Sequence, residues 1–202
     1  MWIRSLMASR FFNVCFCTHP EFSINCRIAM DTVKDYLPQS EGYLPYYLVL
    51  TSILAVGNSL QNYLTLHFSR RLYNGQFIPN LSLPPKSAKF NPEDSTRKFV
   101  PANAESNPKG ARTQDQVTPL AARLFGTYTI ISAIVRIYAA YYLHVAPVYQ
   151  MTIWTYVVAL LHFSSEFAVY RTAYFGPITT TFFFATVGLT WMTSQYSFYV
   201  QA

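Results

Sequence analysis

The sequence has few charged residues, and the shortage is concentrated in certain parts of the chain. Charged side chains make up 12% of the 202 residues, about half the ~25% found in an ordinary soluble domain. Of the 15 basic and 9 acidic side chains, eight lie in residues 1–43 and twelve in residues 68–119. A soluble core does not need this separation, whereas a lipid bilayer does. The remaining four charges are Arg123, Arg136, Glu166 and Arg171.

Cysteine, glycine and histidine are also scarce, which argues against several kinds of site. The three cysteines, Cys15, Cys17 and Cys26, are odd in number and have no histidine at zinc-finger spacing, so we interpret them as incidental thiols. The 7 glycines form neither a dinucleotide-binding nor a P-loop motif. The 4 histidines are fewer than membrane di-iron oxidases use. We therefore predict no catalytic residue, no metal ion and no cofactor.

Long apolar runs take the place of charge. Hydrophobic residues make up 51% of the chain and aromatic residues 17%. A membrane-spanning helix needs ~20 mainly apolar residues. Four segments are long enough, and together they predict an all-α membrane protein, a four-transmembrane-helix bundle. The predicted spans are residues 44–67, 120–143, 148–170 and 177–198.

The segments outside these spans differ in kind from them. Residues 1–43 form an N-terminal segment that we expect to be partly disordered, and Met30 is an alternative start that would remove residues 1–29. Residues 68–119 hold seven of the 12 prolines and show almost no apolar periodicity, which predicts a long, solvated, disordered loop. The net charge of +6 is diluted there among acids and prolines, so we predict no nucleic-acid partner.

The distribution of lysine and arginine predicts an orientation in the membrane. Residues 68–119 carry eight of these side chains, and Arg171 adds a ninth on the same side. The opposite side has four, all before the first span. Because positive loops stay in the cytosol, we expect the long loop to be cytosolic and both termini to be lumenal.

His162 and Glu166 are four residues apart and therefore share a helix face. This pair fits half a metal site or an acid–base pair, but it also fits a polar clamp between helices. Folding the second and third spans into a hairpin brings Arg123 level with Glu166. The register therefore predicts an Arg123–Glu166 ion pair near the cytosolic boundary, with His162, Gln61 or Asn62 beside it.

Arg136 lies at another level of the second span. We expect it to be surrounded there by Thr155, Thr190 and Ser194, or to extend its side chain to the lumenal boundary. It completes the predicted set of structural polar residues in the membrane.

Three sequence motifs lead to a family. ARLFGTYT and VRIYAA in the second span and ALLHFSSE in the third resemble the ergosterol biosynthetic protein 28 family, over roughly residues 42–200. Residues 1–29 and the insert at 79–115 fall outside this resemblance. The resemblance implies a non-catalytic scaffold of the endoplasmic reticulum membrane, which takes part in sterol biosynthesis. It also implies that the chain tethers the enzymes of sterol C-4 demethylation, namely the C-4 methyl oxidase, the C-3 dehydrogenase/decarboxylase and the 3-keto reductase.

Two functional hypotheses remain open. In the first the chain is this multi-pass scaffold, which could also associate with itself. In the alternative it is a sterol-binding or sterol-modifying membrane enzyme that uses Arg136, His162 and Glu166.

Overall fold

The computed structural model describes residues 35–73, 75–102 and 113–200. The contacts within the chain divide it into two units, residues 1–39 and 40–202. Residues 35–39 are the described part of the first unit, and the account below concerns the second. The three cysteines and the alternative start at Met30 lie outside the described residues.

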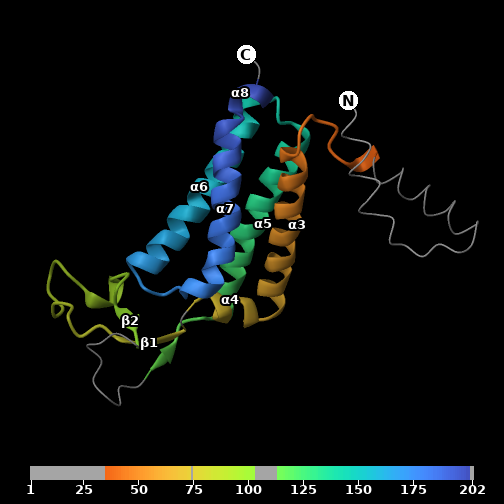
Figure 1. The fold of residues 1–202 in the computed structure, drawn as a ribbon. Coiled ribbons are helices and arrows are strands. Elements are labelled where there is room, and N and C mark those ends of the chain that lie inside the picture. Colours follow the sequence, from red (N-terminus) through yellow and green to blue (C-terminus); the bar gives the residue numbers. More distant parts are fainter. Residues whose placement is uncertain (1–34, 74, 103–112, 201–202) are drawn as a thin grey trace, which may run out of the picture. The chain divides into compact units, whose positions relative to one another are not determined.

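Four long helices account for most of the described structure (Figure 1). They are α3 (Leu44–Leu64), α5 (Pro119–Tyr141), α6 (Ala146–Ala168) and α7 (Phe175–Ser194). Proline lies in the first turn of α3, α5 and α6, where its missing N–H leaves no hydrogen bond unmade. The Thr118 hydroxyl accepts a hydrogen bond from the Ala121 N–H and so caps α5.

These helices overlap the four predicted spans with small differences at their ends. Among the described residues, α5 alone is both long enough and apolar enough throughout to meet the general criteria for a membrane span. Of an apolar stretch of 18 residues in this helix, only 22% is buried within the protein. The other three helices contain 20 to 23 residues, and that they cross a membrane stays a prediction.

The first predicted span is shorter than expected. The sequence predicts residues 44–67, but α3 ends at Leu64, and Thr65 adopts an extended backbone conformation. His67 already belongs to the short helix α4 (His67–Leu72). At the other end of the bundle, α8 (Tyr196–Tyr199) follows α7.

The segment between α4 and α5 differs from the prediction of a disordered loop. Its described residues contain the strands β1 (Gln76–Pro79), β2 (Phe99–Pro101) and β3 (Gln114–Asp115) and the short helix η1 (Pro92–Asp94). The strands pair antiparallel in the order β2-β1-β3. Phe77 lies opposite both Pro101 and Gln114.

The sheet forms because β1 pairs along both edges and buries two apolar side chains. Phe77 and Ile78 are only 8% and 5% exposed, and Val117 after β3 is also buried. A run as short as Gln76–Pro79 gives no measurable alternation in the sequence. The prolines and charges of this segment therefore dominate its sequence pattern, and they do not predict the sheet.

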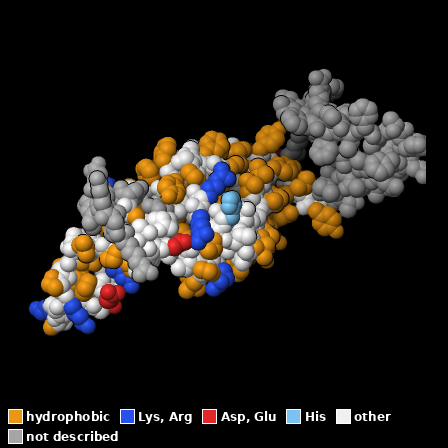
Figure 2. Space-filling view, turned by 90° about the horizontal axis from the view of Figure 1, so that it is seen from below, with side chains coloured by type: hydrophobic (Ala, Val, Ile, Leu, Met, Phe, Trp, Pro, Cys, Tyr) orange, Lys and Arg blue, Asp and Glu red, His pale blue; other side chains and the backbone are white. Residues whose placement is uncertain are grey.

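The helices pack around two apolar clusters. The smaller cluster lies near α4 and contains Leu72, Phe163 and Ile178. The larger contains Leu48, Ala139, Tyr149, Tyr156 and Met192 among other residues. Close packing of α3 on α5 is possible because Gly126 has no side chain, and the Ser59 hydroxyl donates to its carbonyl oxygen at 2.6 Å. In Figure 2, charged side chains lie over the loop and the neighbouring helix ends, and hydrophobic side chains surround them.

Candidate functional site

Aromatic side chains join α4 to α5 and α6 at one end of the bundle. The Tyr73 hydroxyl and His162 Nε2 are 2.8 Å apart and share a hydrogen bond. The Tyr73 ring stacks on Phe163 with its centroid 6.4 Å away and meets Phe125 edge-on at 5.8 Å. We call Tyr73, Phe125, His162 and Phe163 the aromatic junction. It fixes the end of α4 against the two long helices.

Tyr73 remains an uncharged hydrogen-bonding group in this junction. Its burial raises the pKa of the phenol well above the ordinary value, and the nearby Glu166 carboxylate and Tyr128 raise it further. The neutral hydroxyl can therefore bond to His162 across the physiological pH range.

Glu166 interacts with the connection that follows its own helix. Its carboxylate accepts a hydrogen bond from the Thr172 hydroxyl. Its carbonyl oxygen accepts from the backbone N–H groups of Thr172 and Ala173, at 2.8 and 3.4 Å. Glu166 therefore holds the turn between α6 and α7 in shape.

The predicted Arg123–Glu166 ion pair is not formed. Among the described residues the salt bridges are Arg70–Asp115 and Lys98–Glu93, and Arg123 lies exposed. The hairpin register places the two residues at the same level of the bundle. It does not account for the turn after α6, where the Thr172 hydroxyl donates a hydrogen bond to the Glu166 carboxylate. The register also does not account for the close packing of α5 against α3 at Gly126.

Asn62 and Gln61 have different environments, although the sequence suggested either for the polar clamp. Asn62 is 2% exposed, donates to the Asn58 carbonyl oxygen at 2.8 Å and accepts from the Ser69 hydroxyl at 2.7 Å. Gln61 lies exposed. Asn62 thus joins α4 to α3 through Ser69, a partner that the sequence did not predict.

Arg136 lies apart from these polar residues, farther from α4 along the bundle. Its Nε donates to the Thr155 hydroxyl at 3.1 Å, and its guanidinium lies 4.2 Å from the centre of the Tyr156 ring. The Tyr156 hydroxyl lies 3.3 Å from the Thr51 hydroxyl. Of the three neighbours expected for Arg136, Thr155 makes a hydrogen bond with it.

The structure therefore divides the predicted polar residues into separate groups. His162 and Glu166 lie near Tyr73, Asn62 binds Ser69, and Arg136 contacts Tyr156. Tyr156 and His162 are six residues apart on α6, roughly 9 Å along the helix axis. Among the described residues, no three His, Cys, Asp or Glu side chains gather closely enough to hold a metal ion.

A cavity of about 770 Å³ runs between these groups. Residues of α3, α4, α5, α6 and α7 line it, and it is partly open to the outside of the bundle. Arg71 of α4 lies on its wall at one end, and Arg136 lies on its wall at the other. Aromatic rings account for much of the wall between them, contributed by Phe68, Phe125, Tyr128, Tyr156, Phe163 and Phe184.

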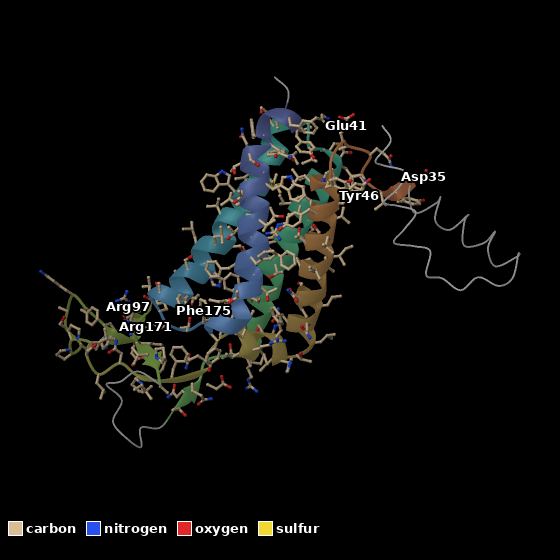
Figure 3. All side chains as sticks on the ribbon, in the orientation of Figure 1. Asp35, Glu41, Tyr46, Arg97, Arg171 and Phe175 are labelled. Carbon is tan, nitrogen blue, oxygen red and sulfur yellow. The ribbon has the colours of Figure 1, made fainter. Side chains whose placement is uncertain are left out.

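The residues after α6 are joined to α4 and to the sheet. The Tyr174 N–H donates to the Leu72 carbonyl oxygen at 3.0 Å, and Tyr73 pairs with Ala173 in an antiparallel bridge. The Arg97 guanidinium lies 5.9 Å from the centre of the Tyr170 ring. Figure 3 shows Arg97 and Arg171 at this end of the bundle, with Phe175 at the start of α7.

We call this assembly the α4 platform: α4 with Tyr73, the three-stranded sheet and residues 169–174. The Arg70–Asp115 salt bridge, at 2.7 Å, joins α4 to β3 within it. Tyr73 and the rest of the platform were not predicted from the sequence, because the prolines and charges of this segment indicate a solvated loop throughout. The aromatic and leucine residues around Arg70 and Arg71 were the one sequence feature that indicated a packed segment here.

Comparison with known proteins identifies the family. The sequence model described as "Erg28 like protein" matches residues 44–190. The protein named "Ergosterol biosynthetic protein 28" of Gibberella zeae is 53% identical over 173 residues, which cover 85% of this chain and 99% of that protein. The proteins of the same name from Candida albicans and Saccharomyces cerevisiae are 32% and 30% identical, over 83% and 79% of this chain and 96% and 84% of their own lengths. No solved structure matches the chain. With the family model covering most of the sequence and a relative matched along almost its whole length, the chain belongs to the Erg28 family.

Proposed function

We propose that the chain is a non-catalytic scaffold of ergosterol biosynthesis in the endoplasmic reticulum membrane. On this proposal it tethers the C-4 methyl oxidase, the C-3 dehydrogenase/decarboxylase and the 3-keto reductase of sterol C-4 demethylation. Tethering raises the effective concentration of successive enzymes, up to the millimolar range for short connections. It also limits the escape of poorly soluble intermediates.

The α4 platform is the observation that carries this proposal. It joins two connections that are far apart in sequence, one before α5 and one before α7, into a single folded surface. A partner can bind such a surface without first ordering it, which lowers the entropic cost of association. A charged surface at the end of the helices suits the soluble parts of membrane-bound enzymes.

The exposed apolar side chains support a bundle of four spans. Each long helix presents large ones at its surface, including Leu60 of α3, Ile131 of α5, Leu161 of α6 and Phe183 of α7, all more than half exposed. Exposed apolar area on this scale is unusual for a water-soluble monomer. Lipid and partner helices are its natural surroundings, with the long loop in the cytosol.

Affinity purification of the tagged full-length chain from membranes tests the scaffold. We expect the three enzymes to co-elute in mild detergent and to be identified by mass spectrometry. Trp154 of α6 is 63% exposed, and an exposed tryptophan is a frequent anchor of interfaces. We therefore expect Trp154→Ala to lower the recovery of at least one enzyme.

Ile53 of α3 provides a matched control because it is 62% exposed. Ile53→Ala should leave recovery unchanged. Recovery of a folded, monodisperse chain without any of the three enzymes would refute the scaffold.

A further inference from the structure

The cavity described above has an arginine at each end, of which Arg71 is exposed and Arg136 is partly buried within the bundle. Arg136 uses its Nε for Thr155 and its flat face for Tyr156. A guanidinium has five N–H donors, and among the described residues no carboxylate lies within salt-bridge distance of Arg136. The remaining donors on the cavity wall are available to an acceptor from outside the chain.

A second donor on the same helix is also unused. Tyr128, Ser132 and Arg136 are spaced four residues apart, so they follow one face of α5 along the cavity. The Tyr128 hydroxyl is buried beside the Ser132 side chain, and in the described part of the chain it makes no hydrogen bond of normal geometry. Buried polar groups normally have a partner. An oxygen-bearing ligand in the cavity would provide one.

The rest of the cavity suits a flat apolar body. Phe125 and Arg136 are eleven residues apart on α5, roughly 16 Å along the helix axis. Phe68, Phe163 and Phe184 add aromatic walls to this length. A volume of about 770 Å³ lies within the range of small-molecule sites. The ligand class is therefore an elongated apolar molecule with an acidic group at one end.

We propose that this cavity binds a sterol carboxylic acid, with its carboxylate at Arg136 and its ring system along the aromatic wall toward Phe68. Arginine binds carboxylates through two parallel charge-assisted hydrogen bonds. The preference for a carboxylate follows from Arg136 alone. The preference for a sterol rests on the proposed function, because a methyl group that is oxidised and then lost as carbon dioxide passes through a carboxylic acid.

Binding of defined ligands to the purified full-length chain in lipid nanodiscs tests the proposal. The probes are a 4-carboxysterol, the matching 4-methylsterol and oleate, each measured by displacement of a radiolabelled 4-carboxysterol. We expect the 4-carboxysterol to bind at least tenfold more tightly than the other two. Equal binding of the 4-methylsterol would overturn the role of the acid, and equal binding of oleate would overturn the sterol class.

Variants locate the site. Arg136→Gln should weaken 4-carboxysterol binding about tenfold or more, which corresponds to about 1.4 kcal/mol, and should leave 4-methylsterol binding unchanged. Arg123→Gln is the matched control, because Arg123 is an exposed arginine on the same helix that does not line the cavity. Loss of binding with Arg71→Gln instead of Arg136→Gln would overturn the assigned orientation.

A second pair of variants tests the site without changing its charge. Thr180 lines the cavity and Thr179 beside it does not. Thr180→Trp should abolish binding by filling the cavity, whereas Thr179→Trp should retain it. Wild-type affinity in Thr180→Trp would overturn the site. Because these assays use the chain alone, failure to bind the sterol acid would leave enzyme co-purification intact, and failure of co-purification would leave binding intact.

Discussion

At the scale of single residues, the polar side chains near α4 act in pairs. Asn62 binds Ser69, Tyr73 binds His162, and Glu166 binds Thr172. Each pair adds a side-chain hydrogen bond between a long helix and a connecting segment or the short helix α4. Removing one member leaves its buried partner without a hydrogen bond, which costs more than the bond itself contributes.

The pair of Asn62 and Ser69 gives the most direct test. Asn62→Ala should lower the free energy of unfolding by about 1–3 kcal/mol, because the Ser69 hydroxyl, whose residue is 4% exposed, loses its acceptor. Chemical unfolding of the chain in detergent micelles measures this loss. The neighbouring variant Gln61→Ala should change stability by less than about 0.5 kcal/mol. Equal losses in the two variants would contradict the assignment.

Tyr73 links stability to pH. Below about pH 10, the ordinary pKa of tyrosine, the folded and unfolded chains both keep the phenolic proton. Burial raises the pKa of Tyr73 in the folded chain, so the unfolded chain loses the proton first above that pH. This residue's contribution is therefore lost as the pH rises through its folded-state pKa.

Tyr73→Phe should accordingly change both the stability at pH 8 and the way in which stability falls at higher pH. At pH 8 it should cost about 0.5–1.5 kcal/mol through loss of the hydrogen bond to His162. Between pH 9 and about 11 the variant should lose less stability than the wild type. Thermal unfolding in micelles at several pH values measures both, and parallel pH profiles would disprove this role of Tyr73.

At the scale of the secondary-structure elements, glycine determines how closely α6 and α7 approach each other. A Cβ atom at Gly188 of α7 would lie 2.6 Å from Cζ of Tyr156, and Tyr156 is only 1% exposed. Gly188→Ala should therefore cost about 1–3 kcal/mol through overpacking.

Gly57 of α3 is the matched helical position, because a Cβ atom there meets nothing within 4 Å. Gly57→Ala should raise stability by up to about 1 kcal/mol, since alanine favours the helix. Unfolding measurements on both variants compare the signs of the two effects. A stabilising Gly188→Ala would show that the helices are farther apart than described.

The sheet is tested by its buried strand. Ile78 is 5% exposed, whereas Leu81 in the turn after β1 is 83% exposed. Ile78→Ser should open the segment, so that trypsin cuts faster at Lys86 and Lys89 under native conditions. Leu81→Ser should not change the rate of cutting. Identical digestion of both variants and the wild type would mean that β1 is not packed.

The sequence predicted the helices better than the contacts between them. Residues 120–143 and 148–170 gave clear signals because an apolar run of that length is seldom anything but a helix. The sheet was missed because β1 has only four residues and its partners β2 and β3 are even shorter. The Arg123–Glu166 pair was wrong because helical register fixes height along an axis and says nothing of a later turn at Thr172.

At the scale of the whole molecule, the main prediction concerns orientation. Asn80 begins the acceptor sequence Asn80-Leu81-Ser82, and on the proposed topology it stays unglycosylated in the cytosol. The Asn80 amide also donates to the Arg97 carbonyl oxygen, so an unmodified Asn80 is not sufficient proof. A second acceptor placed at the exposed residues 86–89 removes this ambiguity.

We expect no glycan at residues 86–89 and a glycan on an acceptor added after the C-terminus. Electrophoretic mobility with and without endoglycosidase measures both. A glycan on the loop acceptor would show that the loop is lumenal and that the proposed topology is inverted.

The bridge between Tyr73 and Ala173 also sets an order of events during synthesis. The two residues are about a hundred positions apart, and a ribosome adds roughly 5–20 residues per second. For some 5–20 seconds after α4 has been made, the backbone that anchors it does not yet exist. The surface offered to partners is therefore completed only when residues 169–174 have been made, and a nascent chain that stops before them has no finished surface to offer.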